Sequence, residues 1–216
     1  MKEMTRKLLV ATHNPGKVQE YREILADLLL EVTYLDAEGI TFEVEETGTT
    51  FAENAILKAT TYAGLTGLWT WADDSGLEVD ALGGAPGVYS SRYAGPGASD
   101  ADRYRKLLDA LAGVPWDRRT ARFRCTVALA APGGDVRTAD GTCEGIIAFG
   151  PAGSNGFGYD PVFYFLEQAA TMAQLEPEVK NRISHRGRAA QAAVRVLGEM
   201  LKQESDTLLS RPLLLD

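Results

Sequence analysis

The stretch Trp69–Gly76, with the sequence WTWADDSG, constrains this chain more than any other. Its apolar run is typical of a buried strand, yet it ends in two adjacent carboxylates, Asp73 and Asp74. We expect the strand to stop there in a tight turn that carries both acids. Such a turn makes a poor core and a suitable metal site, because Mg²⁺ prefers hard oxygen ligands and completes its shell with waters and substrate phosphates. The remainder of the chain must then supply a phosphate site.

A strand, a polar turn and a helix are predicted near the start of the chain. Lys7–Ala11 is a compact apolar run, and Thr12–Lys17 (THNPGK) follows it. Asn14 is a favourable helix N-cap, and Pro15 suits the first helical position. The unpaired N–H groups of the helix start, together with Lys17, form a candidate anion site. The alternative is an ordinary strand-to-helix turn with a solvated lysine, since the spacing of a Walker loop is absent.

A second helix is predicted to begin near Thr50. Thr50 and Glu53 have the spacing of a capping box, in which each side chain binds the backbone of the other residue. Asn54 and Lys58, four residues apart, then share one face of the helix. Taken alone, the acids within Glu43–Glu46 are typical of a solvated rim, and Lys58 is typical of a surface lysine.

The second half of the chain contains two strand-like runs, Ala121–Ala131 and Val136–Phe149, which predict a long antiparallel hairpin. The glycine-rich stretch Gly150–Asp160 comes next, and its glycines permit a close approach of the backbone to a ligand. Phe157 or Tyr159 in this stretch can stack on a flat base, as aromatic side chains do in single-strand binders. The alternative is a connecting loop whose aromatic residues belong to the core.

A basic cluster follows toward the end of the chain. A helix is predicted to begin near Pro177 and to run, with an interruption, to Lys202. Within it, Lys180–Arg188 (KNRISHRGR) brings together five basic or imidazole side chains, and His185 is one of only 2 histidines. A solvated helix end is the alternative interpretation. An acidic chain that binds phosphate nevertheless needs positive charge in one place.

The formal net charge of -8 argues against a general binder of nucleic acids or membrane surfaces, which carries a basic face. It does not exclude an anionic small molecule as the ligand, because exposed charges are screened over about 8–10 Å at physiological salt. Cys125 and Cys143 lack metal-type spacing, so we expect buried free thiols in a reducing, cytoplasmic setting. No run approaches the ~20 apolar residues of a membrane span, and the first apolar run is interpreted as a strand instead of a signal peptide.

Taken together, these stretches resemble the inosine triphosphate pyrophosphatase family. The shared motifs occur in the family's order and span about residues 7–200. The departures are the pair Ser154–Asn155, where many members have a smaller pair, and a tail that runs beyond the usual family end. The motifs in this chain are Thr12–Lys17, Glu45–Gly48, Phe51–Ala55, Lys58–Ala59, Ala72–Leu77, Gly83–Gly95, Gly156–Pro161 and Lys180–Gly187.

The resemblance implies an elongated α/β fold, with a long mixed β-sheet flanked by helices and an active-site cleft between two lobes. We expect residues 1–204 to form this single domain, with the long hairpin at about residues 120–150, and residues 205–216 to form a C-terminal tail of unknown role. The resemblance also implies Mg²⁺-dependent hydrolysis of ITP, dITP and XTP to the monophosphate and pyrophosphate, which cleanses the nucleotide pool. Members are usually homodimers, and neither a nucleic-acid polymer nor a membrane is expected as a partner.

By the same resemblance, Glu46 and Asp74 hold Mg²⁺, and Asp74 orients or deprotonates the attacking water. A water on such a cation ionises more easily than bulk water, so an ordinary carboxylate serves as base at neutral pH. Lys17 and Lys58 stabilise charge on the leaving pyrophosphate. Arg186 is a pure donor, which suits the 6-oxo group of hypoxanthine or xanthine and opposes the amino group of adenine. The implied substrate-binding residues are Thr12, His13, Asn14, Pro15, Gly16, Lys17, Lys58, Ser75, Phe157, Gly158, Tyr159, Asp160, Lys180, His185 and Arg186.

Three other interpretations stay open. A related pyrophosphatase with another base preference, such as modified pyrimidines, fits poorly with the pair His185 and Arg186. A catalytically silent nucleotide-binding or sensing protein fits poorly with intact Lys17, Glu46 and Asp74. An interaction scaffold built on the hairpin leaves the charged motifs unexplained. In the main interpretation, Asp73 is a supporting residue that holds either the turn or the groups around the metal, and it is not itself a metal ligand.

Overall fold

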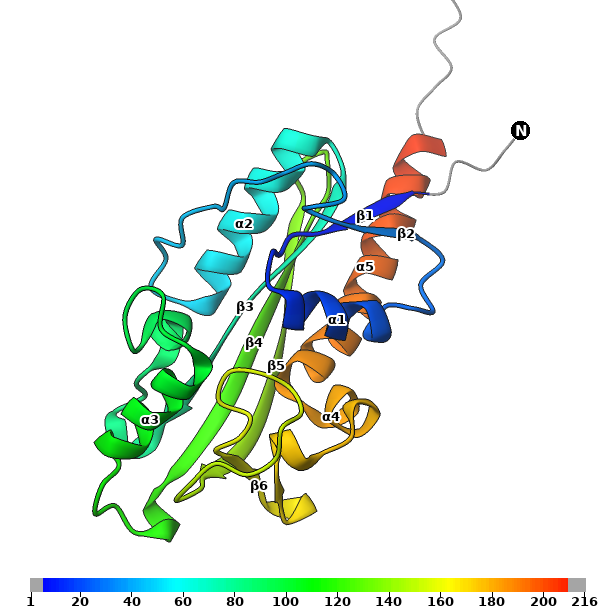
Figure 1. Ribbon diagram of the computed structural model, residues 1–216. Helices are drawn as coiled ribbons and strands as arrows, with labels where there is room; N and C mark the ends of the chain where they lie inside the picture. Colours follow the sequence, from blue (N-terminus) through cyan, green and yellow to red (C-terminus); the bar gives the residue numbers. More distant parts are fainter. Residues whose placement is uncertain (1–5, 210–216) are drawn as a thin grey trace, which may run out of the picture.

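The computed structural model describes residues 6–209, which form one mixed β-sheet with helices on both faces (Figure 1). Within these residues the strands run in the order β2-β1-β3-β4-β5-β6-β7, which confirms the expected α/β architecture with a long mixed sheet. The strands are β1 (Lys7–Val10), β2 (Glu31–Tyr34), β3 (Trp69–Val79), β4 (Thr120–Ala130), β5 (Val136–Ile147), β6 (Phe163–Phe165) and β7 (Ala170–Thr171). The helices are α1 (Pro15–Ile24), α2 (Phe51–Thr66), α3 (Asp100–Ala110), α4 (Pro177–Ile183) and α5 (His185–Leu209), with short 3-10 segments such as η2 (Gly87–Arg92) between them.

Strand β1 determines where a ligand can bind beside the sheet. It pairs in parallel with β2 on one side and with β3 on the other. In open α/β sheets, a strand whose neighbours diverge in this way opens a crevice beyond its carboxyl end. The ladder between β1 and β3 stops at Val10 and Trp71, whereas β3 continues to Val79. Among the described residues, the edge of β3 from Ala72 to Gly76 therefore has no strand partner on this side and can line a cleft, whereas Glu78 farther along pairs with Pro86.

The tight turn expected at Asp73 and Asp74 is wrong. Strand β3 passes through both acids without interruption, because β4 pairs with it antiparallel as far as Val79 opposite Ala121. The apolar residues before the acids and those after them, Leu77 and Val79, therefore belong to one strand. Successive side chains of a strand point to opposite faces of the sheet. Asp73 and Asp74 therefore face different layers of the protein.

The same alternation builds an apolar layer on each face of the sheet. Trp71 and Leu129 pack in the cluster that α1 and α5 cover on one face. Ala72 and Ala128 belong to the cluster that α2 covers on the other, where small side chains allow the helix to approach closely. Figure 1 shows α2 and α5 on opposite sides of the long strands. These layers hold α1, α2 and β3 in fixed positions around the cleft.

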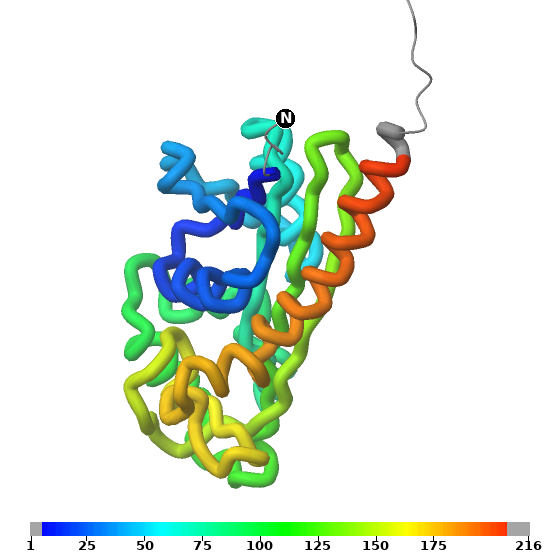
Figure 2. Tube along the Cα trace, turned by 90° about the vertical axis from the view of Figure 1, so that its right-hand side faces the viewer, coloured from blue at the N-terminus to red at the C-terminus, as the bar shows by residue number. Residues whose placement is uncertain are grey.

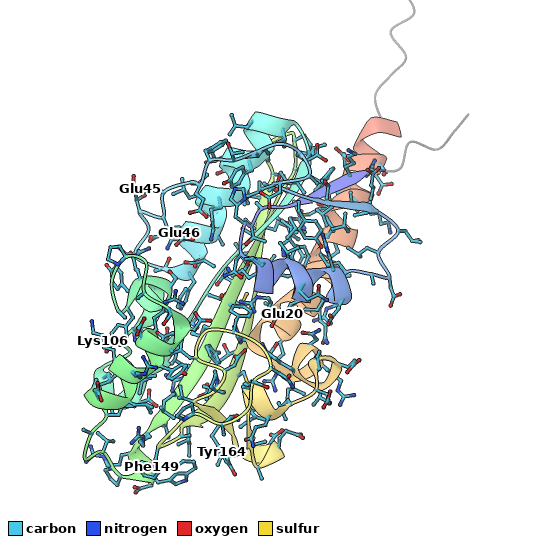
Figure 3. All side chains as sticks on the ribbon, viewed as in Figure 1. Glu20, Glu45, Glu46, Lys106, Phe149 and Tyr164 are labelled. Atoms are coloured by element: carbon cyan, nitrogen blue, oxygen red, sulfur yellow. The ribbon has the colours of Figure 1, made fainter. Side chains whose placement is uncertain are left out.

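The predicted hairpin is confirmed as β4 and β5, which pair from Thr120 opposite Ile146 to Ala130 opposite Val136. Figure 2 shows the hairpin running along most of the molecule, with α5 beside it. At the lower end, a third apolar cluster joins the hairpin to α3 and to the segment around β6. The exposed Phe149 marks this end in Figure 3. The hairpin therefore carries the sheet well beyond β1 and gives the molecule its length.

Helix boundaries follow the capping signals in the sequence. Asn14 caps α1 and Pro15 occupies its first turn. Thr50 and Glu53 form the predicted capping box at α2. The expected interruption of the last helical segment is confirmed at Ser184, between α4 and α5.

Helix α5 continues through Leu209 and so includes the first residues of the expected tail. Residues 210–216 of that tail lie outside the described part of the chain. Cys125 and Cys143 are both free and buried, as predicted. None of the helices within residues 6–209 is long and apolar enough to cross a membrane.

Candidate active site

A cavity of about 740 Å³ opens at the free edge of β3. Its walls come from the turn before α1, the loop before α2, η2, the glycine-rich loop before β6, and the helices α4 and α5. The structure brings all the sequence-derived site residues to this one cavity, although they are spread along most of the chain. They are Thr12, His13, Asn14, Pro15, Gly16, Lys17, Glu46, Lys58, Asp74, Ser75, Phe157, Gly158, Tyr159, Asp160, Lys180, His185 and Arg186.

Asp73 lies behind the cavity wall, on the face that α1 and α5 cover. Lys17 Nζ is 2.8 Å from its Oδ2, and Arg186 Nε is 3.7 Å from the same oxygen. Burial acts to raise the pKa of Asp73, but the charges of Lys17 and Arg186 outweigh it and hold that pKa well below its usual range. Asp73 is therefore a permanent anion that holds two of the sequence-derived site cations in place.

Asp74 faces the cavity from the opposite layer. Its Oδ2 accepts a hydrogen bond from Asn54 Nδ2 at 3.0 Å, and its Oδ1 accepts one from the backbone of Ser75 at 2.9 Å. The amide oxygen of Asn54 accepts a backbone N–H, which fixes the orientation of the amide. Burial raises the pKa of Asp74, while Lys58 opposes the rise and the charge of Glu46 adds to it. An oriented carboxylate that is costly to charge is suited to take up a cation or a proton.

Glu46 and Asp74 lie around a shared positive charge. Lys58 Nζ is 2.5 Å from Glu46 Oε1, donates to the backbone oxygen of Asp73 at 2.7 Å, and also interacts electrostatically with Asp74. Two carboxylates beside a main-chain oxygen form a hard-oxygen donor set that fits Mg²⁺ when waters and phosphates complete its shell. Within residues 6–209, no group of three or more His, Cys, Asp or Glu side chains is placed to hold a metal. A metal would therefore depend on this pair and on its ligand. Figure 3 shows Glu46 near α2, with Glu45 farther out on the same loop.

Glu20 of α1 organises the opposite wall, and the sequence motifs alone do not single it out. Its Oε1 is 2.8 Å from Lys180 Nζ, and its Oε2 forms a close ion pair with Arg186. Asp160 Oδ2 lies 2.5 Å from the same lysine nitrogen. All four side chains are buried. The available signal was the spacing of Glu20 three residues after Lys17, which places both on one helix face. Figure 3 shows Glu20 on α1, across the long strands from Glu46.

Phe157 lies between the expected phosphate turn and the expected base-reading residues. Its ring is 5.1 Å from Lys180 Nζ and 5.2 Å from Arg186 Cζ. The same ring approaches Gly16 so closely that a Cβ there would lie 2.6 Å from a ring carbon. The backbone N–H of Phe157 donates to Asp160, which fixes this part of the loop. The glycine-rich loop therefore closes against α1, and the glycine at position 16 permits that contact.

Tyr159 belongs to the lower core, as the alternative interpretation of the glycine-rich loop expects. It is buried, and its hydroxyl donates to the backbone oxygen of Ser90 at 2.9 Å. Beside it, the backbone N–H of Gly158 donates to Asp100 Oδ2 at 2.7 Å. These contacts tie the loop to η2 and α3. Ser90 and Asp100 both line the cavity, although Asp100 lies outside the sequence motifs and the motif Gly83–Gly95 gives Ser90 no role.

His185 stands at the first turn of α5. Its ring stacks on Phe123 with the ring centroids 4.6 Å apart and the planes 14° from parallel. Burial, followed by the charges of Arg186 and Lys180, holds the pKa of His185 well below its usual range, so the ring is neutral. Its Nδ1 is buried and has no hydrogen-bond partner among the described residues. A neutral imidazole with an unused nitrogen is suited to bind a polar ligand atom.

Two glycines allow α5 to begin where it does. A Cβ on Gly141 of β5 would lie 2.2 Å from the backbone oxygen of His185. A Cβ on Gly187 would lie 1.7 Å from the backbone oxygen of Asn181 in α4. Backbone atoms cannot rotate away from such contacts. The first turn of α5 is therefore pressed against β5 and α4, which places His185 and Arg186 at the cavity.

The turn before α1 is held by its own side chains. Thr12 Oγ1 accepts from the backbone of Asn14, and Asn14 Oδ1 accepts from the backbone of Lys17, both at 3.1 Å. His13 Nδ1 lies 2.9 Å from Asp36 Oδ1, and its Nε2 lies 3.3 Å from a backbone oxygen in the loop before α2. The turn is therefore organised before any ligand binds.

A family model described as the Ham1 family matches residues 8–196. The chain belongs to the Ham1 family. Curated relatives of this Ham1 chain are named dITP/XTP pyrophosphatase. The one from Desulforamulus reducens is 52% identical, with 90% of this chain and 96% of the relative covered. The one from Bacillus subtilis is 47% identical, with 89% of this chain and 97% of the relative covered. These matches confirm the family resemblance that the motifs indicate.

Solved Ham1 structures have the same architecture. A HAM1 protein from Coxiella burnetii is similar with a TM-score of 0.82 and 44% identity, covering 90% of this chain and 100% of that chain. A structure named nucleoside-triphosphatase / dITP/XTP pyrophosphatase, from Mycobacterium abscessus, has a TM-score of 0.71 and 44% identity, covering 87% of this chain and 98% of that chain. The elongated mixed sheet is therefore the Ham1 fold.

Proposed function

We infer that this Ham1 chain is a nucleoside triphosphate pyrophosphatase that hydrolyses deaminated purine nucleotides, namely ITP, dITP and XTP, to the monophosphate and pyrophosphate. The observation that carries the inference is one cavity lined by the carboxylates of Asp74 and Glu46, which contact side chains of α2, and by the buried pair His185 and Arg186 of α5. The names of the curated relatives support the same activity. The enzyme would remove such nucleotides from the precursor pool.

Asp74 is proposed as the general base. Its two oxygens are oriented by Asn54 and by the backbone of Ser75, and its raised pKa makes it a better proton acceptor than an ordinary aspartate. Glu46 and Asp74 would hold Mg²⁺, which when bound supplies positive charge to the phosphates and eases the ionisation of water. Asp74 takes the proton of the attacking water as the bond between the α- and β-phosphates breaks and pyrophosphate leaves.

The phosphate chain is proposed to lie between the turn Thr12–Lys17 and Lys58. The helix start of α1 offers N–H groups and the positive end of its dipole to an anion. Lys58 neutralises Glu46 in the free protein and is close enough to Asp74 to act on its charge. Its ammonium then stabilises the charge that develops on the leaving pyrophosphate.

The base is proposed to bind at His185 and Arg186, near the ring of Phe157. Glu20 and the Ser75 hydroxyl hold the Arg186 guanidinium, so its donors are oriented in advance. A guanidinium only donates, which favours the 6-oxo group of hypoxanthine and xanthine over the amino group of adenine. A buried site that leaves a donor unpaired rejects the wrong base strongly.

Pyrophosphate release from XTP, ITP, dITP, GTP, ATP and TTP, measured with Mg²⁺ and again with EDTA, tests this function. We expect fast release from XTP, ITP and dITP, slow release from the other three, and loss of activity in EDTA. No release from any nucleotide would favour a silent nucleotide-binding protein. Equal release from XTP and TTP would reject the base preference, and full activity in EDTA would reject the metal.

We also propose that residues 1–204 act as one catalytic domain with the cleft between two lobes, that the enzyme is a homodimer, and that it works in the cytoplasm. The family resemblance supports all three, and the free, buried Cys125 and Cys143 are consistent with a reducing compartment. Sedimentation equilibrium of the purified chain tests the dimer, and a monomer at micromolar concentration would reject it.

A further inference from the structure

We propose that Arg92 of η2 is a phosphate-binding residue, held near Glu46 in the free protein and used for the pyrophosphate portion of the substrate. The inference rests on the proposed function, since it requires a polyphosphate ligand. The cations of the cavity differ in how closely they are paired with carboxylates. Those near α1 and α5 have close carboxylate partners: Lys17 with Asp73, Lys180 with Glu20 and Asp160, and Arg186 with Glu20.

Arg92 is paired much less tightly than these. Its Nη1 lies 3.7 Å from Glu46 Oε2, a charge contact that is too long for a hydrogen bond. Its guanidinium donates no hydrogen bond to any residue between positions 6 and 209, and its other contact is with the ring of Tyr89, 5.0 Å away. By contrast, Lys58 engages Glu46 at 2.5 Å. Unlike the other cavity cations named above, Arg92 therefore has guanidinium donors available to bind a ligand.

The backbone that carries Arg92 is fixed to β3. Two residues earlier, Ser90 Oγ accepts a hydrogen bond from the backbone of Leu77 at 2.9 Å, and the Ser90 backbone oxygen accepts from Tyr159. Strand β3 permits this approach because Gly76 has no side chain: a Cβ there would lie 2.7 Å from Ser90 Oγ. Only the half-exposed side chain of Arg92 has to move to reach a ligand in the cavity.

The position of Arg92 determines which part of a nucleotide it can bind. It lies on the wall with Glu46 and Lys58, whereas the expected base-reading residues His185 and Arg186 lie at the start of α5. A guanidinium matches the geometry of phosphate oxygens and can donate two parallel hydrogen bonds to them. A ligand phosphate that takes these donors replaces a long contact to Glu46. Arg92 should therefore respond to pyrophosphate and triphosphate but not to a nucleoside monophosphate.

Titration calorimetry with inorganic pyrophosphate and with XMP tests the proposal, using Arg92→Met, Arg92→Lys and wild type. Each titration is run in Mg²⁺ and again in EDTA. We expect Arg92→Met to weaken pyrophosphate binding by about tenfold or more, the usual effect of losing a hydrogen bond to a charged group, and to leave XMP binding within about twofold. Arg92→Lys should recover part of the loss. Arg105→Met, which removes an exposed arginine of α3 outside the cavity, is the matched control and should bind like wild type.

Pyrophosphate binding within about twofold of wild type in Arg92→Met would overturn the proposal. Equal losses for pyrophosphate and XMP would overturn it as well, because they would indicate a general disturbance of the cavity. Failure of the wild-type protein to bind pyrophosphate would also overturn the proposal. The nucleotide panel described above decides the catalytic function separately, since it is measured on wild type alone.

Discussion

Asp73 and Asp74 are neighbours in the sequence but face opposite layers of the sheet, and they have opposite electrostatic characters. The pKa of Asp73 is held well below its usual range by Lys17 and Arg186 in spite of its burial, whereas burial raises the pKa of Asp74. One strand thus delivers a structural anion to the α1–α5 face and a reactive carboxylate to the α2 face. Mutation of each acid alone can therefore distinguish the structural role from the catalytic one.

Replacement of Asp73 by Asn should destabilise the fold strongly. It removes the countercharge of Lys17 and Arg186, and breaking a buried ion pair from one side typically costs about 3–5 kcal/mol. Urea denaturation at neutral pH measures the loss in the free energy of unfolding. Wild-type stability in Asp73→Asn would contradict the anchoring role, and Asp135→Asn, at an exposed turn residue, serves as the control.

Replacement of Asp74 by Asn should instead affect turnover. Removing a general base commonly lowers the rate by about 10²–10⁴-fold. The loss of stability should be smaller than for Asp73→Asn, because the folded state gains nothing from charging a group whose pKa is raised. Steady-state kinetics with XTP and a urea titration of the same sample measure both quantities. Near-normal kcat would remove Asp74 from the base role.

The contact between β5 and the start of α5 predicts the effect of a single methyl group. Gly141→Ala forces α5 away from the sheet, and overpacking of this kind costs about 1–3 kcal/mol. Because His185 and Arg186 move with the helix, kcat/KM for XTP should fall together with Tm. Gly198→Ala is the matched control: it lies farther along α5, and nothing within 4 Å would contact its Cβ. It should leave activity unchanged and stabilise the helix by up to about 1 kcal/mol. Equal behaviour of the two variants would contradict the close contact.

The neutral His185 predicts a pH dependence of stability. Its pKa in the folded state is held well below the unfolded value of about 6.5, mainly by burial and then by Arg186 and Lys180. Below about pH 6.5 the unfolded chain therefore binds a proton that the folded chain does not, and stability falls as the pH decreases. The slope from this one group approaches about 1.4 kcal/mol per pH unit.

Urea denaturation between pH 7.5 and pH 5.5 measures that slope. The test compares wild type with His185→Gln, which should lose the dependence that this group contributes. His13→Gln, at the other histidine, keeps His185 and should keep its contribution. An unchanged slope in His185→Gln would show that the imidazole is not held neutral.

Local signals in the sequence were sufficient for much of the fold. Asn14 and Thr50 predict their helix starts correctly, and alternation predicts the hairpin β4–β5, because these features depend on neighbouring residues. The turn at Asp73 was wrong because pairing with β4, a long-range interaction, keeps charged residues inside a strand. The residues that the family motifs single out line one cavity. Their roles in binding and catalysis stay predictions.

The site residues whose roles the sequence did not reveal were missed for one common reason. Glu20 and Asp100 lie outside the family motifs, and Ser90 lies within Gly83–Gly95 without an assigned role. All three act through contacts with residues far away in the chain. Arg92 likewise occurs within a motif, but its position beside Glu46 depends on how η2 lies against β3. Residues that orient other residues are recognised from three-dimensional contacts and not from spacing.

The ion pair between Glu20 and Arg186 joins residues that are 166 positions apart, and this separation has a consequence for biosynthesis. When α1 leaves the ribosome, the cations that neutralise its buried carboxylate have not yet been translated. Burying that charge without them is costly, so α1 cannot dock stably until α4 and α5 follow. The site therefore assembles only after α4 and α5 have been translated. A product truncated before Lys180 would carry all seven described strands, but its first helix would be undocked and open to proteases and its cavity would be unfinished.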